Sequence, residues 1–267
     1  MTDSPNCNLF TKSIYQKLTG NANSTIACCQ SQIKCNAQNE IISINLPNRG
    51  LKGQISSDFA QLTSLTEINF TNNSLTGTIP DLSACNQLKS LLLNINKLTG
   101  SLPASIGKIT TLENLIIHDN ELSGPIPSSI GNLVNLINFN LGYNKLTTIP
   151  PELGNLRKVQ LFVIMNNAVT GKIPETLGQL ALCERLYLSS VSYRRFLNNN
   201  QLTGTIPPEL GNLAYLTNLD LSFNKLSGSI PTSLGNLVNM DLIDMSTNTL
   251  TGPIPSELGK MLKVQEM

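Results

Sequence analysis

Short runs of alternating apolar and polar residues recur along most of the chain at a nearly constant spacing. One copy reads LTNLDLSFNKLSGSIPTSLGNL, residues 216–237, and its first half alternates leucine with polar residues. Alternation with a period of two predicts a short strand with one buried face, and the apolar residues of the second half return to the same core. A unit of this size predicts a solenoid, in which neighbouring turns cover one another's apolar edges.

The copies align on an asparagine that follows each predicted strand. Successive gaps are 23, 24, 24, 23, 33, 24 and 24 residues, and the positions are Asn73, Asn96, Asn120, Asn144, Asn167, Asn200, Asn224 and Asn248. An earlier copy, INLPNRGLKGQI, has Arg49 in this place, so we expect nine turns over about residues 41–260 and the start of a tenth at 261–267. Because an asparagine amide both donates and accepts, this ladder can satisfy backbone groups inside each bend.

The second half of each unit has the pattern G-x-I-P. Glycine permits a backbone conformation that a Cβ hinders, and proline fixes φ and donates no hydrogen bond, so this half directs the chain along the back of the coil. The copies include GTIP (77–80), GPIP (124–127), GKIP (171–174) and GSIP (228–231). In these motifs, over about 220 of the 267 residues, the chain resembles the plant-type leucine-rich-repeat family.

That family includes ectodomains of receptor-like kinases, receptor-like proteins, polygalacturonase inhibitors and related secreted proteins of fungi and protists. The resemblance implies an α/β solenoid, a curved right-handed coil with a parallel sheet on its concave face and a 3-10 or irregular back. It also implies an N-terminal cap over residues 1–40, because CCQSQIKC resembles the cysteine signature of that cap. By resemblance, Cys7, Cys28, Cys29 and Cys35 form two disulfides, whose connectivity the sequence leaves open.

Several turns depart from the pattern. The fifth, NKLTTIPPEL, lacks the glycine and one residue, which predicts a local kink in the back, and the turn containing Asp81–Cys85 is one residue short. The seventh carries the insertion SSVSYRRFL, residues 189–197. Three interpretations are open: a loop at the edge of the concave face, a remnant of a gene-model error, or a functional lid presenting Tyr193, Arg194, Arg195 and Phe196.

Composition and charge narrow the function classes. With a net charge of +1, 13% charged residues and no basic run, the chain lacks the surplus that nucleic-acid binding requires. No stretch of about 18 apolar residues predicts a membrane span, and the start, MTDSPNCNLF, shows no signal peptide. We expect the signal peptide to be missing from this chain and an anchor or kinase to have been lost beyond Met267.

The cysteines and sequons bear on the compartment. Paired cap cysteines imply an oxidising, extracellular or cell-surface location, and Asn23, Asn69 and Asn72 lie in glycosylation sequons. Cys85 and Cys183 occupy core positions of the repeat and are expected to be buried thiols. Four turns separate them, about 19 Å at one strand spacing per turn, too far for a disulfide.

No motif for catalysis or cofactor binding stands out. The chain has no H-E-x-x-H, P-loop or G-x-G-x-x-G pattern, and its single histidine, His118, is followed by Asp119 without a nucleophile placed by any motif. Asp220 and Asp244 share a column on the sheet, but an open sheet lacks the cleft that tunes an acid and a base. The sequence therefore indicates a non-enzyme with no cofactor or metal.

The predicted concave face offers a site instead. Strand register exposes apolar residues on turns three to seven, between Asn-rich and Asp-rich ends, which is the anatomy of a protein interface. The expected partner-binding residues are Leu92, Ile95, Ile116, His118, Tyr143, Leu161, Val163, Met165, Tyr187 and Phe223, with Ile137 nearby. An alternative is that these residues pack only on each other or beneath the inserted segment.

Two functions remain for the whole chain. The first is a secreted or cell-surface recognition module of receptor or inhibitor type that binds a protein or peptide. The second is an intracellular scaffold with reduced cysteines. The partner and the oligomeric state are not specified by any residue pattern.

Overall fold

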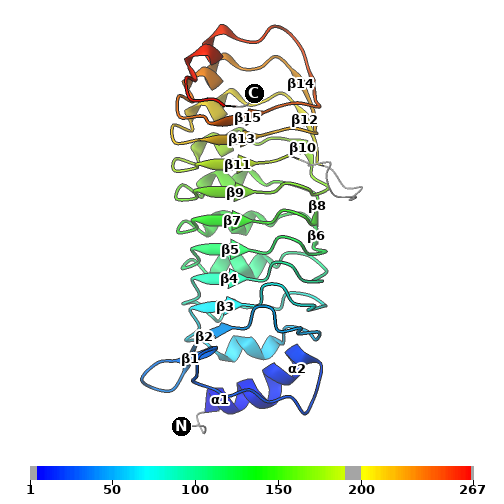
Figure 1. Cartoon of the computed structure of the whole chain (residues 1–267), viewed down its shortest axis with the longest axis vertical. Helices are drawn as coiled ribbons and strands as arrows, with labels where there is room; N and C mark the ends of the chain where they lie inside the picture. Colours follow the sequence, from blue (N-terminus) through cyan, green and yellow to red (C-terminus); the bar gives the residue numbers. More distant parts are fainter. Residues whose placement is uncertain (1–4, 190–199, 266–267) are drawn as a thin grey trace.

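A computed structural model describes residues 5–189 and 200–265 as one stack of coils, with strands along one face and short helices along the opposite face (Figure 1). The cap lies at one end and the last turn at the other. Within the described residues no helix has the length and apolar character that a membrane crossing needs. The inserted residues Tyr193, Arg194, Arg195 and Phe196 lie outside the described residues.

The predicted parallel sheet is confirmed and follows the chain order from one end of the stack to the other. In the described ranges nine parallel strands, one per predicted turn, pair in sequence, and the antiparallel strand β1 closes the first edge. The strands are β1 (Ile33–Cys35), β2 (Ile41–Asn45), β3 (Glu67–Asn69), β4 (Ser90–Leu92), β5 (Asn114–Ile116), β7 (Asn138–Asn140), β9 (Leu161–Val163), β11 (Arg185–Tyr187), β13 (Asn218–Asp220) and β15 (Leu242–Asp244).

A second ladder of short strands follows the asparagine bends. It comprises β6 (Ser123–Gly124) with β8 (Lys145–Leu146), and β10 (Thr170–Lys172), β12 (Gln201–Gly204), β14 (Lys225–Gly228) and β16 (Thr249–Leu250). Strand pairing breaks between β8 and β10, although Thr170 N still donates to Thr147 O at 2.9 Å. The break falls in the fifth turn, where the glycine and one residue are missing. The irregularity therefore lies in the strand ladder, whereas the sequence predicted a kink in the back, where this turn keeps a five-residue 3-10 helix, Pro151–Asn155.

The back of the coil consists of five-residue 3-10 helices that begin after proline or serine. These are η2 (Ser57–Gln61), η3 (Ala104–Lys108), η4 (Ser128–Asn132), η5 (Pro151–Asn155), η6 (Glu175–Gln179), η7 (Pro208–Asn212), η8 (Thr232–Asn236) and η9 (Ser256–Lys260). The short turn containing Asp81–Cys85 has hydrogen-bonded turns in place of a 3-10 helix, with Cys85 N bonded to Leu82 O. Of the two turns that lack a residue, this one changes its back, whereas the fifth keeps a 3-10 helix there, η5, and differs in its strand pairing.

The core is one continuous column of leucine and isoleucine between the two faces. Two aromatic pairs lie in it: Phe59 of η2 with Phe70 just after β3, ring centroids 5.8 Å apart, and Phe139 of β7 with Phe162 of β9, 5.0 Å apart. All four rings are fully buried. Since dispersion and apolar burial scale with contact, each turn depends on both neighbours for its share of the stability.

The cap is a helical segment docked on the first turn. Helix α1 (Pro5–Leu9), a π-helical stretch η1 (Phe10–Ile14) and α2 (Tyr15–Thr19) run continuously, and disulfides join Cys7 to Cys28 and Cys29 to Cys35. The free carbonyls at the end of α2 are satisfied by the first turn, because Gly53 N and Gln54 N donate to Leu18 O and Lys17 O. The Lys17 ammonium also contacts the Asp58 carboxylate at 2.8 Å.

Candidate ligand-binding surface

The strand register places the expected residues on the open face of the large sheet. In β3, β4, β5, β7, β11, β13 and β15 the central side chain is buried and its two neighbours are less so. Leu91 and Leu93 are fully buried, while Leu92 between them faces outward and is half-buried. The register inferred from L-x-L is therefore confirmed.

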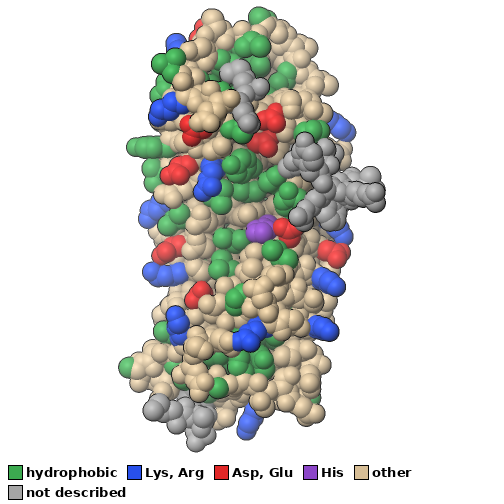
Figure 2. All heavy atoms as spheres, viewed as in Figure 1, with side chains coloured by type: hydrophobic (Ala, Val, Ile, Leu, Met, Phe, Trp, Pro, Cys, Tyr) green, Lys and Arg blue, Asp and Glu red, His purple; other side chains and the backbone are tan. Residues whose placement is uncertain are grey.

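The apolar residues of this face form two groups rather than one. In the central column Leu92 pairs with Ile116, and Val163 pairs with Tyr187, but Asn140 lies between the two pairs. The second group, which we call the apolar patch, comprises Leu161, Val163, Met165 and Tyr187. Figure 2 shows hydrophobic side chains gathered on the sheet at the height of β9 and β11.

Val163 differs from the expectation that it would be exposed. Val163 lies outside the core cluster, yet only 5% of its surface is accessible to solvent. Its neighbours across the sheet, Asn140 and Tyr187, cover it from both sides. Tyr187 is itself partly covered, and burial raises the pKa of its phenol. Val163 thus supports the patch from below, while Leu161, Met165 and Tyr187 present the accessible surface.

A groove of about 540 Å³ runs along the rim of the sheet, across turns three to six. Its walls are the residues that precede the ladder asparagines: Ile95, Asp119, Tyr143 and Asn166, with Glu121 and Lys145 on the outer side. All four wall residues have a left-handed backbone, φ +53° to +58°. We call this feature the rim groove. The sequence pattern placed Ile95 and Tyr143 on the face but did not predict a groove.

The left-handed backbone turns the wall side chains away from the bend. Asparagine and aspartate tolerate this conformation, whereas a β-branched residue such as Ile95, with φ +58°, is strained in it. Ile95 is nevertheless 42% exposed, so core packing does not explain its identity. Phe223, on turn eight, has the same conformation, φ +50°.

The ladder asparagines serve the backbone and not the surface. In the bend of turn five, Asn144 Oδ1 accepts from Leu122 N at 3.0 Å. Its Nδ2 donates to the carbonyls of Ile117, Leu141 and Gly142 at 3.1–3.2 Å. Equivalent bonds form at Asn73, Asn96, Asn120, Asn167, Asn200, Asn224 and Asn248. These amides are occupied, so a ligand would contact them only at the groove floor.

Polar residues bound the apolar groups at both ends of the sheet. Asn69 Nδ2 donates to Asn45 Oδ1 at 3.0 Å on the first turns, and Asp220 pairs with Asp244 on the last. Each aspartate uses Oδ1 to accept a backbone N–H two residues later, from Ser222 at 3.0 Å and from Ser246 at 2.8 Å. An apolar centre between an amide-rich and an acidic end is typical of a binding face.

In the part of the chain that the structure describes, the single histidine and the two free cysteines form no hydrogen-bonded pair of nucleophile and base. His118 Nδ1 lies 2.7 Å from Asp119 Oδ2, and within the described residues no hydroxyl or thiol is bonded to this imidazole. Burial raises the pKa of the Cys85 thiol to about 11 and that of Cys183 to about 12. Both are fully buried and free, as expected, and such thiols are poor nucleophiles.

The three sequon asparagines differ in their surroundings. Asn23 is exposed in the cap loop, and Asn72 is exposed but donates to Asn48 Oδ1. Asn69 lies on the sheet face with its oxygen accepting from Thr71 N at 3.0 Å, besides its bond to Asn45. A glycan on Asn69 Nδ2 would have to displace the hydrogen bond from this nitrogen to Asn45 Oδ1.

The repeats match known proteins in sequence and in fold. The family model described as Leucine Rich Repeat matches residues 64–85, 111–133, 135–156, 196–213 and 215–237. Receptor-like kinase TMK2 of Arabidopsis thaliana is 38% identical over 86 residues, which are 31% of this chain and 10% of that protein. The chain spans about a tenth of the length of the curated relatives it matches.

Solved plant ectodomains share the whole coil. The ectodomain of the Arabidopsis thaliana membrane receptor kinase GASSHO1/SCHENGEN3, solved with CASPARIAN STRIP INTEGRITY FACTOR 2, superposes with a TM-score of 0.85 at 34% identity. That match covers 97% of this chain and 31% of the receptor chain. The Arabidopsis receptor kinase HAESA, solved with the peptide hormone IDA and the co-receptor SERK1, gives a TM-score of 0.69 at 32% identity, over 94% of this chain and 46% of that one.

Proposed function

We propose, on the premise that this chain is a leucine-rich-repeat protein similar to plant receptor ectodomains, that it is a non-catalytic module recognising a peptide or protein segment. The observation that carries this proposal is the open sheet face, with its apolar patch beside the rim groove. Both features present side chains that lie outside the core cluster, among them Ile95, Tyr143, Met165 and Tyr187. The similar receptors GASSHO1/SCHENGEN3 and HAESA were each solved with a bound partner.

The ligand that fits this surface is an extended segment. The rim groove follows four successive turns and offers the apolar walls Ile95 and Tyr143 beside the Asp119 carboxylate. The neighbouring patch adds the accessible side chains of Met165 and Tyr187. An extended chain can lay alternate side chains into such a surface, and burial of a few aromatic anchors supplies most of the affinity.

The test compares a tyrosine of the rim groove with an exposed tyrosine outside it. Peptides are selected from a displayed random library on the immobilised chain, and their affinities are then measured on Tyr143→Ala and Tyr215→Ala. Tyr215 is 59% exposed in the loop before β13, outside the rim groove. Loss of an aromatic anchor costs about 2 kcal/mol, so Tyr143→Ala should weaken binding roughly 30-fold while Tyr215→Ala leaves it unchanged.

Two results would contradict the proposal. One is a set of selected peptides that bind both variants as well as the parent chain. The other is their retention by a Tyr143→Ala, Met165→Asp double variant whose circular dichroism spectrum and unfolding midpoint match those of the parent.

We also propose that the module works outside the cell or at its surface. The two cap disulfides and the likeness to receptor ectodomains support this location. Intact-mass measurement of the native protein after alkylation without reduction tests it. Two alkylated thiols, from Cys85 and Cys183, are expected after unfolding, whereas six would favour the intracellular scaffold.

A further inference from the structure

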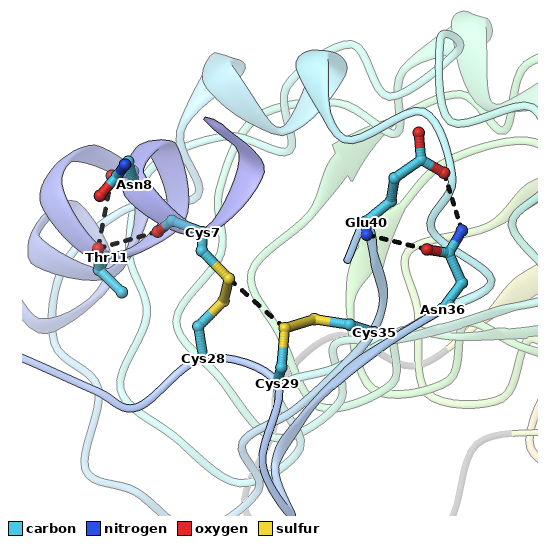
Figure 3. The surroundings of a disulfide bond; sticks show 8 residues. All are labelled: Cys7, Asn8, Thr11, Cys28, Cys29, Cys35, Asn36 and Glu40. Carbon is cyan, nitrogen blue, oxygen red and sulfur yellow. Dashed lines mark hydrogen bonds between the residues drawn. A yellow bond between two sulfur atoms is a disulfide. The ribbon is translucent and has the colours of Figure 1, made fainter. Parts of the chain in front are cut away.

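Four sulfur atoms converge in the cap from three separate segments of the chain. Cys7 comes from α1, Cys28 and Cys29 from the segment that leads into β1, and Cys35 from the end of β1 (Figure 3). All four Sγ atoms lie within 4.8 Å of one another. The Sγ atoms of Cys7 and Cys29 are 3.6 Å apart although they belong to different disulfides.

We propose that reduction of both disulfides converts this cluster into a tetrathiolate site for one Zn²⁺ ion. Zinc–sulfur bonds of about 2.3 Å in a tetrahedron place the sulfurs about 3.8 Å from one another. The 3.6 Å between Cys7 and Cys29 already matches that spacing, and the widest pair must approach by only about 1 Å. Once the S–S bonds are broken, the paired sulfurs can separate by side-chain rotation, with the backbone left in place.

A phosphine can serve as the reductant for converting the two disulfides into four thiols. Each phosphine gives two electrons to one disulfide and is oxidised to its oxide with oxygen from water, so that two thiols form. The four thiols then lose four protons as they bind Zn²⁺. Because thiolate is a soft ligand, this donor set selects zinc over calcium and magnesium.

The surroundings of the cluster suit metal retention. Cys7 and Cys28 are 1% and 9% exposed, which shields half of the ligand set from water, while the half-buried Cys29 and Cys35 leave a route for the ion. The cap contributes only a short helix and one strand to the end of the sheet, so it needs a cross-link to stay folded. A zinc ion would supply that cross-link where disulfides cannot form.

Metal uptake by the reduced full chain tests the site. The chain is reduced with excess phosphine without oxygen and titrated with Co²⁺, whose thiolate charge-transfer absorption reports sulfur ligation, and then with Zn²⁺. We expect saturation at one equivalent, and an unfolding midpoint that rises when Zn²⁺ is added. Zn²⁺ should also protect four of the six cysteines from alkylation after mild unfolding of the core.

Two variants locate the ligands. Cys85→Ala removes a thiol buried outside the cap and should leave the one-equivalent uptake unchanged. Cys7→Ser should weaken uptake more than tenfold. Absence of charge-transfer absorption in the reduced parent chain, or equal uptake by Cys7→Ser, would overturn the proposal. If Cys7→Ser does not fold, the count of protected thiols in the parent decides, because fewer than four also overturns it.

Discussion

Substituting one glycine at the back of the coil tests whether contact between successive 3-10 helices outweighs the intrinsic conformational preference of the residue. Gly154, in η5, has ordinary backbone angles, so an alanine there would by propensity stabilise the chain by about 0.4–1 kcal/mol. However, a Cβ on Gly154 would lie 2.3 Å from Thr176 O and 2.8 Å from Thr176 C in the next turn. Since real Cβ contacts do not fall below 3.0 Å, η6 would have to move away.

The steric term should exceed the propensity term. Moving η6 by roughly 1 Å in a close-packed interior opens space beneath it, and such overpacking costs about 1–3 kcal/mol. The net expectation for Gly154→Ala is a destabilisation of about 2 kcal/mol, or a thermal midpoint lower by roughly 4–8 °C for a chain of this size. The same constraint holds at Gly107, Gly131, Gly178, Gly211 and Gly235, where an added Cβ would lie 2.2–2.3 Å from a carbonyl oxygen of the next turn.

The matched control is Gly259→Ala in η9, where an added Cβ meets nothing within 4 Å. Here the propensity term acts alone, and the midpoint should stay the same or rise. Thermal unfolding followed by circular dichroism at one scan rate measures both variants. A Gly154→Ala midpoint equal to or above that of the parent, with Gly259→Ala unchanged, would refute the idea that contact between successive 3-10 helices fixes these glycines.

Three further predictions address the ladder, the rim and the cap. Asn144→Leu leaves the Leu122 N–H without a partner in a buried bend and removes one of two donors from each of three carbonyls, so urea unfolding should show a loss of about 3 kcal/mol. Asn248→Leu, in a partly exposed bend, should cost less than half of that. Ile95→Asn removes the strain of a β-branched residue in the left-handed conformation and should raise the free energy of unfolding by about 1 kcal/mol in the same assay. It should also weaken the binding of any ligand in the rim groove. Asp58 lies in η2, where the cap docks on the first turn, and hydrogen bonding from the Lys17 ammonium lowers its pKa to about 2 in the folded chain, from an ordinary value near 4. The stabilisation of the docked cap is therefore complete at neutral pH and is lost as pH falls from about 4 towards 2. The protection factors of the cap-helix amides, which correct hydrogen exchange for its intrinsic pH dependence, should fall over that range in the parent and lose this pH dependence in Asp58→Asn.

The sequence predicts the coil well because each repeat position has one physical task. Period-two alternation specified which of Leu91, Leu92 and Leu93 faces outward, and the structure has the same register. The asparagine spacing located every bend that lies in the described residues. The disulfide pairing of the cap followed only from the three-dimensional arrangement, since the sequence of four cysteines alone allows three pairings.

The surface was harder to predict, because exposure depends on neighbours in other turns. Val163 has a strand position identical to that of Leu92, yet its neighbours Asn140 and Tyr187 cover it. The rim groove also escaped the pattern. A signal for it lay in the position just before the ladder asparagine, where Asn48, Asn72, Asp119 and Asn166 are residue types that tolerate a left-handed backbone. Isoleucine and aromatic residues at the same position in other turns hid this preference.

The left-handed residues just before the ladder asparagines indicate where a ligand would lie. A left-handed position favours asparagine or aspartate, so an apolar residue there has a cost of about 1–2 kcal/mol that packing must offset. Ile95, Tyr143 and Phe223 incur it without becoming buried. Strained residues cluster where function requires their side chains. Since two of these three line the rim groove, the most economical explanation is that their side chains contact a partner. A binding site confined to the central column would leave that strain without a purpose.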